Sequence, residues 1–238
     1  MRAKAAEDSW RHCRPPNVVG FIGFVQNQRV GKFSGGYTLG AKNVFLISVQ
    51  TGCDQGVERA QFLGHESRTR EPRRRWLFRQ LSLRGSERED PETLKRFLRQ
   101  GLRNTSVTCA LIGETTTFSR WVRYETFCSF ARGNGLFAIR IHGIGSLHSP
   151  PSAAGSNVFA DIAFTVVGDR IRFREYTTQG WQYSLDIDGM LLNEVAYDLG
   201  GRTNHTFSSL FPIYDWNADG GRDNLNSWIE AAARAAGK

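Results

Sequence analysis

The sequence predicts an α/β fold in which a parallel central sheet is followed by an antiparallel β-meander. Between residues 43 and 145, three apolar runs rich in β-forming residues alternate with two helix-like segments. Buried strands that alternate with helices are typical of a parallel sheet. After Pro150 and Pro151 the pattern changes to polar–apolar alternation broken by glycine turns, which is typical of antiparallel strands.

The first strand and the first helix have clear sequence signals. The run Asn43–Gln50, "NVFLISVQ", predicts a strand that is buried on both faces. A helix is predicted from Asp90, a preferred N-cap residue, with Pro91 at the first helical position, where its missing N–H is not needed. The inward face of this helix is apolar at helical spacing and consists of Leu94, Phe97, Leu98 and Leu102.

The same order of elements is then repeated. Ser106–Gly113 predicts a second buried strand, and a second helix begins after a Ser119 cap. That helix ends before Gly133, a residue suited to the left-handed conformation that closes many helices. Leu136–Gly145 predicts the third strand. Right-handed crossovers place these strands parallel in a doubly wound, flavodoxin-like sheet.

Three regions are expected along the chain. Residues 1–40 show no clear period and are expected to be an N-terminal extension outside the domain, whereas 41–150 form the α/β domain. Residues 151–238 are expected to pack on this domain as a meander and a short terminal helix. The meander turns at Gly168 and Gly180, and the helix directs Trp228 inward together with Ile229.

Composition excludes several classes of protein. No apolar run approaches the roughly 20 residues that a membrane span needs, so no membrane partner and a cytoplasmic location are expected. The four cysteines form no CxxC pair and no cluster has metal-ligand spacing, so neither a zinc site nor a disulfide framework is expected.

Four stretches carry a resemblance to a known family: "NTSVTCALIG", "SRWVRYE", "RGNGLFAIRIHGI" and "YDWNADGGRDNLNSW". In this order, over roughly residues 90–229, they resemble the TIR-like subunit of the bacterial Thoeris antiphage system. The resemblance implies a TIR fold and NAD as a substrate rather than a bound cofactor. It also implies a cyclic ADP-ribose isomer as product, which activates a separate effector protein. The position that matches the catalytic helix glutamate of TIR enzymes is Glu125.

The resemblance fails between about residues 46 and 88, where family patterns such as "NVVRNxWVTK" are absent. Codons for residues 58–67, "ERAQFLGHES", can be chosen so that the reading frame shifted by one base translates as "NVRNSWVTK". Two other pieces of the segment can be read in the same way. Our hypothesis is an out-of-frame translation of about forty residues, and the alternative is true divergence. Since TIR sites are completed by the loop after the first strand, weak NAD turnover is expected of the chain as encoded.

The charge distribution bears on nucleic-acid binding. Residues 46–88 contain nine arginines, no lysine and five acidic residues, and so carry half of the net charge of +8. Apart from Trp76 and Phe78, aromatic residues are not interleaved with these arginines as they are in surfaces that bind single strands. No nucleic-acid partner is therefore expected, whereas an oligomer is compatible with the sequence.

The candidate site residues surround the second predicted helix. Without the resemblance, Glu125 would be a solvated helix residue; with it, Glu125 is the catalytic candidate. Trp121, one turn earlier, is expected either to stack on the substrate or to belong to the core. Ser119 is a substrate-binding candidate or only a cap, and His142 follows the third strand at the edge where such sheets bind ligands. Asp215 is expected to serve packing.

Two other functions stay open beside cyclic ADP-ribose synthesis. The chain could be an NAD glycohydrolase that releases ADP-ribose and nicotinamide, or a TIR-fold interaction module without catalysis. Incubation with NAD separates the three, because they give a cyclic product, a linear product or none.

The coding DNA tests the frame hypothesis. We expect the "NVRNSWVTK" frame to be open from about Leu46 to Glu87. Stop codons in that frame would establish true divergence instead.

Overall fold

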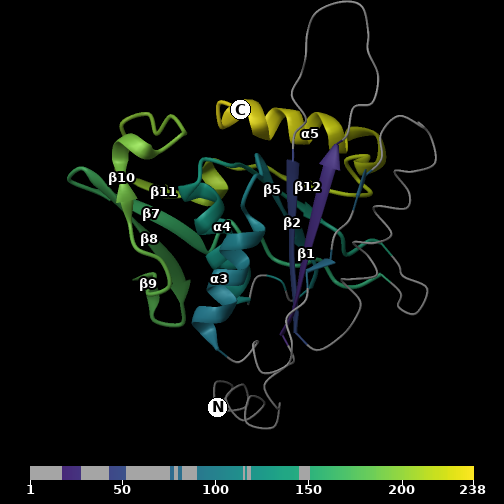
Figure 1. Ribbon diagram of the computed structural model, residues 1–238, viewed down its shortest axis with the longest axis horizontal. Coiled ribbons are helices and arrows are strands. Elements are labelled where there is room, and N and C mark those ends of the chain that lie inside the picture. The colour runs from purple at the N-terminus through teal and green to yellow at the C-terminus, as the bar shows by residue number, and fades with distance from the viewer. Residues whose placement is uncertain are drawn as a thin grey trace, which may run out of the picture.

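The computed structural model of the chain describes residues 18–27, 43–51, 76–77, 80–81, 90–114, 116, 119–144 and 151–238, the first four ranges as strand backbone only. In this part of the chain, two sheets enclose helices α3 (Pro91–Gly101) and α4 (Arg120–Ala131). Figure 1 shows α3 and α4 between the antiparallel strands on the left and the strands of the larger sheet on the right.

The larger sheet has the strand order β12-β6-β5-β2-β1-β3, with β4 also paired to β1. Four of its strands are parallel, and their order is that of strands 1, 3, 4 and 5 in the flavodoxin-like arrangement. The predicted α/β class with a parallel central sheet is therefore confirmed. The four parallel strands are β2 (Asn43–Thr51), β5 (Val107–Ile112), β6 (Gly135–Arg140) and β12 (Ile213–Asp215).

Strand β1 (Val18–Asn27) corrects the expectation that residues 1–40 lie outside the domain. It pairs antiparallel with β2 from Val18 opposite Thr51 to Gln26 opposite Asn43. Two glycines interrupt the run "VVGFIGFVQN" and weaken its strand signal, but pairing along a central strand outweighs that weakness. Two short strands, β3 (Trp76–Leu77) and β4 (Gln80–Leu81), also pair with β1. The rest of residues 52–88 lies outside the described residues.

The caps of the two enclosed helices agree with their sequence signals. The Asp90 carboxylate accepts hydrogen bonds from the backbone N–H groups of Glu92 (3.3 Å) and Thr93 (3.0 Å). Gly133 has the expected positive φ, +65°. The apolar stripe of α3 faces inward, with Leu94, Leu98 and Leu102 buried and Phe97 partly buried.

The second sheet is antiparallel, with the order β10-β8-β7-β11 and β9 paired to β8. The first three of its strands along the chain, β7, β8 and β9, form the predicted meander, and Gly168 and Gly180 have positive φ at its turns. Two short strands were not predicted, because segments of two or three residues carry no period. The strands are β7 (Ile162–Val167), β8 (Arg170–Thr177), β9 (Gly180–Tyr183), β10 (Met190–Leu191) and β11 (Asn204–Thr206), with 3-10 turns at Leu192–Glu194 and Phe207–Ser209.

Helix α5 (Gly221–Ala235) covers the other face of the parallel sheet. Trp228 and Ile229 are buried against β5 and β6, as predicted, and at 15 residues this helix is longer than expected. Strand β12 joins the edge of the same sheet. Residues after 150 therefore contribute both to the meander and, through β12 and α5, to the parallel sheet. The expected boundary at residue 150 does not separate two structural units.

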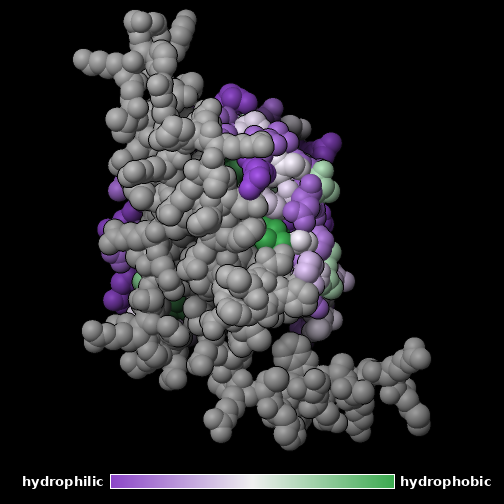
Figure 2. Space-filling model, turned by 90° about the vertical axis from the view of Figure 1, so that its right-hand side faces the viewer, coloured by the Kyte–Doolittle hydropathy of each residue, from purple (hydrophilic) through white to green (hydrophobic). Residues whose placement is uncertain are grey.

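The surface on the side shown in Figure 2 has no broad apolar patch among the described residues in view. The described atoms there are mostly hydrophilic, with a few strongly hydrophobic ones between them.

Phe130 tests how firmly α4 holds the two sheets together. It is fully buried, and its ring lies 5.1 Å from that of Phe164 and 5.3 Å from that of Tyr197 between ring centroids. We expect Phe130→Ala to lower the free energy of unfolding by about 3–5 kcal/mol. Urea denaturation followed by fluorescence and circular dichroism measures this. The exposed Val167→Ala is the control, and a loss below about 1 kcal/mol for Phe130→Ala would contradict the packing role.

Candidate active site

Helix α4 begins after β5, at the carboxyl edge of the parallel sheet, and its first turns carry three of the candidate residues. Ser119 occupies the N-cap position and is 7% exposed, but its side chain makes no capping hydrogen bond among the described residues. Its backbone carbonyl accepts from the Arg123 N–H at 3.4 Å. Ser119 therefore lies where a cap belongs, with its hydroxyl not used by the helix.

Glu125 is buried in the second turn of α4. Its side chain is 1% exposed, and neither carboxylate oxygen has a hydrogen-bond partner among the described residues. Burial removes water from the charged form and raises the pKa of Glu125 well above its usual value. The solvated helix position that the sequence suggested for Glu125 is therefore wrong.

The adjacent Tyr124 and Ser129, one turn further on, show which way Glu125 points. Ser129 faces the parallel sheet, because its hydroxyl accepts a hydrogen bond from Thr108 of β5 at 2.9 Å. Tyr124 faces α3, because the Lys95 ammonium lies 5.8 Å from its ring centroid. On a helical period Glu125 lies between these two directions, toward the part of the sheet formed by β2 and β5.

The hydroxyl groups around Glu125 are committed to other partners. Thr126 donates to the carbonyl of Val122 at 2.7 Å, and Thr108 donates to Ser129 while accepting from the Asn134 amide at 3.3 Å. Buried polar groups are normally paired, and this network satisfies its own members without Glu125. A buried carboxylate with no partner among the described residues, beside a satisfied network, is a candidate for ligand contact.

Cys128, one turn after Glu125, is not a reactive thiol. Burial is the main cause that raises its pKa to about 11. A thiol held in its neutral form is a poor nucleophile, so Glu125 is the chemically distinctive group of this helix.

Trp121 has a structural role that the sequence left open. It is partly buried, packs against the core, and meets the Tyr124 ring edge to face at 6.3 Å. The guanidinium of Arg120 lies 5.0 Å from the centre of the Trp121 ring system. Arg120 is itself paired with Asp186, which also binds Lys95 at 3.2 Å. The core alternative for Trp121 thus has structural support, and contact with substrate stays a prediction.

His142 lies at the carboxyl edge of the parallel sheet, as expected, but in a separate cluster. Its Nδ1 is 3.7 Å from Oδ2 of Asp215, which ends the neighbouring strand β12. Within the described residues no hydrogen bond is made by that nitrogen, and no hydrogen bond or ion pair joins His142 to α4. Asp215 was expected to serve packing only. The parallel pairing of β6 and β12 brings these two residues together, and no local sequence pattern signals it.

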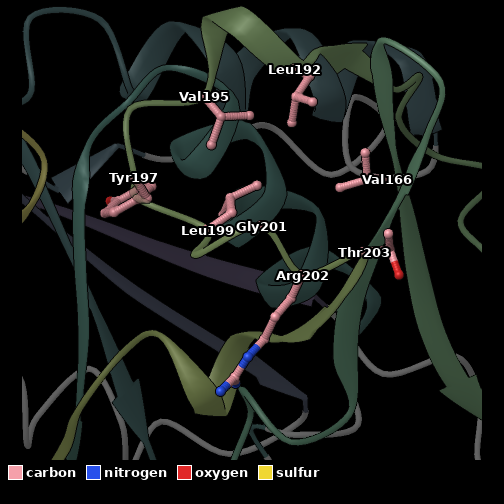
Figure 3. Close-up of a pocket in the computed structure, with 8 residues that line it drawn as sticks. All are labelled: Val166, Leu192, Val195, Tyr197, Leu199, Gly201, Arg202 and Thr203. Atoms are coloured by element: carbon pink, nitrogen blue, oxygen red, sulfur yellow. The ribbon is translucent and has the colours of Figure 1, made fainter.

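A cavity of about 280 Å³ lies beside the second sheet, and Glu125 is not among its lining residues. Figure 3 shows the side chains of Val166, Leu192 and Val195 directed into a common space, whereas Arg202 is directed away from it. Its lining is mainly apolar, includes Arg202 and Thr203, and contains no carboxylate. It therefore offers no group that could stabilise a developing cation.

The part of the chain that the structure describes contains no group of three or more His, Cys, Asp or Glu residues able to hold a metal ion. No helix in this part is both long and apolar enough to cross a membrane.

Comparison with known proteins identifies the family. Residues 62–145 match the family model described as "Thoeris protein ThsB, TIR-like domain". A relative from Bacillus cereus (strain MSX-D12), named "Putative cyclic ADP-D-ribose synthase ThsB1", is 33% identical over 138 residues, which are 57% of this chain and 72% of the relative. The chain belongs to the Thoeris ThsB TIR-like family. The resemblance stated from the sequence is therefore confirmed.

The extent of the ThsB match bears on two earlier questions. It includes β5, α4 and β6, and hence Ser119, Trp121, Glu125 and His142. It begins at residue 62, inside the segment 46–88, which counts in favour of true divergence over an out-of-frame origin for residues 62–88. The coding DNA stays the deciding measurement.

The raised pKa of Glu125 predicts how stability depends on pH. Because the folded state prefers the neutral acid, protonated Glu125 favours folding. Its contribution to the free energy of unfolding is complete below the pKa of Glu125 in the unfolded chain and is lost as the pH rises through the pKa in the folded protein. Relative to Glu125→Gln, the wild type should therefore lose up to about 1.4 kcal/mol per pH unit in that window. Urea unfolding of both proteins from pH 4 to pH 8 measures this difference. If the free energies of unfolding of the two proteins changed in parallel with pH, Glu125 would be solvated.

Proposed function

We propose that the chain converts NAD into a cyclic ADP-ribose isomer and that Glu125 is the catalytic carboxylate. The observation that carries the proposal is the burial of Glu125 with both oxygens unpartnered among the described residues. The name of the relative at 33% identity supports the same reaction class.

The chemistry requires stabilisation of positive charge. Breaking the bond between nicotinamide and ribose develops an oxocarbenium-like cation, which a nearby carboxylate stabilises, as in glycoside hydrolysis. Nicotinamide is a good leaving group, so no strong general acid is required. One carboxylate in a dry position is therefore sufficient for this step.

The raised pKa of Glu125 agrees with a cationic substrate. Without a ligand, burial favours the neutral acid. The nicotinamide ring of NAD is positively charged, and an opposite charge close to a carboxyl group lowers its pKa and favours the ionised form. Binding of NAD would thus produce the charged form of Glu125 that the reaction needs.

Cyclisation and hydrolysis differ in the nucleophile that captures the cation. Attack by a hydroxyl of the same molecule gives a ring, whereas attack by water gives linear ADP-ribose. Exclusion of water and a folded-back substrate favour the ring. Under this proposal Trp121 and Ser119 help position NAD beside Glu125, and the cyclic product acts on a separate effector protein.

Glu125→Gln tests the proposal. The substitution keeps size and hydrogen-bonding capacity but removes the charge, so NAD conversion should fall about 100- to 1000-fold. Chromatography and mass spectrometry of the products, for the chain as encoded and for a version with the alternative frame restored, measure this.

The control is Glu92→Gln, which removes an exposed helix carboxylate whose side chain is 68% exposed. It should leave turnover unchanged. Retained cyclic product with Glu125→Gln would make the catalytic assignment wrong. Linear ADP-ribose from the wild type would establish the glycohydrolase, and no product from either version would favour the non-catalytic module.

A further inference from the structure

The outward face of the second sheet carries arginines and aromatic rings in register. Along β8 the buried residues Ile171 and Phe173 alternate with residues that point outward. Strand β9 pairs with the end of β8, which places its aromatic residues beside them. We name this set the arginine–aromatic face: Arg170, Arg172, Arg174, Tyr176, Trp181 and Tyr183.

The rings and guanidinium groups of this face are in contact. The Arg172 guanidinium lies 3.8 Å from the centroid of the Tyr183 ring, and Arg174 lies 5.7 Å from the centre of the Trp181 ring system. Tyr176 meets Trp181 edge to face at 5.5 Å. Tyr176 is 51% exposed and Tyr183 is 42% exposed, so the rings are held in place while remaining open to solvent.

The positive charge of the face is not neutralised within the described residues. The cross-strand neighbours of its arginines on β7 are Ala163, Thr165 and Val167, none of them acidic. None of the ion pairs among described residues includes Arg170, Arg172 or Arg174. The acidic residue of the same strand, Glu175, instead contacts Arg123 at 3.5 Å.

The hydrogen bonds of these arginines also leave their charge unpaired. Arg170 donates to the carbonyl of Gly189 at 3.1 Å, and Arg174 donates to the hydroxyl of Thr165 at 3.4 Å. Both acceptors are neutral. The guanidinium groups are therefore oriented by the sheet without losing their attraction for an anion.

We propose that the arginine–aromatic face binds single-stranded nucleic acid. Outward residues on a strand recur about every 6.8 Å, which is comparable with the separation of successive phosphates along an extended single strand. Exposed rings and guanidinium planes provide stacking platforms for unpaired bases. This proposal revises the expectation of no nucleic-acid partner, which considered only the arginines of residues 46–88.

The residue composition of the arginine–aromatic face favours single-stranded nucleic acid over other binding partners. A second copy of the chain carries the same net charge of +8 and is not complementary to it. An acidic protein would use the guanidinium groups but leave the rings unused. A duplex presents phosphates without exposed base faces, so it too would leave the rings unused.

Fluorescence anisotropy with labelled 20-nucleotide single-stranded DNA and RNA tests the proposal in the absence of NAD, so its outcome is independent of the proposed enzymatic activity. We expect binding that weakens as salt rises. The double variant Arg172→Gln/Arg174→Gln should reduce the slope of log K against log salt by about 1.4. Trp181→Ala should weaken binding about fivefold or more, and Tyr183→Leu provides a second ring variant if melting shows that Trp181→Ala is unfolded.

The matched control removes two exposed arginines elsewhere, Arg103→Gln/Arg234→Gln, and lowers the net charge equally. It should change binding much less than the double variant on the face. Equal losses in the two double variants, or no loss with either ring variant, would overturn the proposal. So would absent binding at low salt, or equal binding of a duplex of the same length or of poly-glutamate.

Discussion

Helix α4 is enclosed between two sheets, and this enclosure determines the chemistry of its side chains. Phe127 and Phe130 pack against the second sheet, while Ser129 bonds to Thr108 of the parallel sheet. From Tyr124 to Phe130 this helix is buried on every side, so each polar group there must find a partner in the protein or a ligand. Thr126 and Ser129 find protein partners, but Glu125 finds none among the described residues.

This placement opposes stability to the proposed function at Glu125. A buried unpaired carboxylate costs stability when ionised, and a structural role would normally provide a cation for it. Two cations in the neighbouring part of the fold, Lys95 and Arg120, are both engaged by Asp186. Their hydrogen bonds hold the pKa of Asp186 below its usual value, with the bond from Arg120 contributing most. Among the described residues, no cation pairs with Glu125, which suits the proposed site, where the cation arrives with the substrate.

The sequence predicted the regular parts of the fold because their signals are local. The Asp90 cap, Gly133 and the meander turns all appear where their residue types required them. Strand β1 was missed because its stability comes from pairing with β2, a contact distant in sequence. The burial of Glu125 was missed although polar and apolar residues of this helix are not separated onto two faces, as they are in a typical surface helix. The contact between His142 and Asp215 required knowledge of strand order, which no local pattern contains.

Strand β8 shows how one short segment serves both the core and the surface. Its inward residues complete the aromatic cluster around Phe130, and its outward arginines depend on β9 for their ring contacts. Cross-strand register, not sequence spacing, creates that surface, since Arg174 and Tyr183 are opposite each other only through the hairpin. Arg123 of α4 also reaches Glu175 and the carbonyl of Tyr176 on this strand. Because Arg123 is two residues before Glu125, the strand that presents the arginine–aromatic face also helps to hold the helix that carries the buried carboxylate.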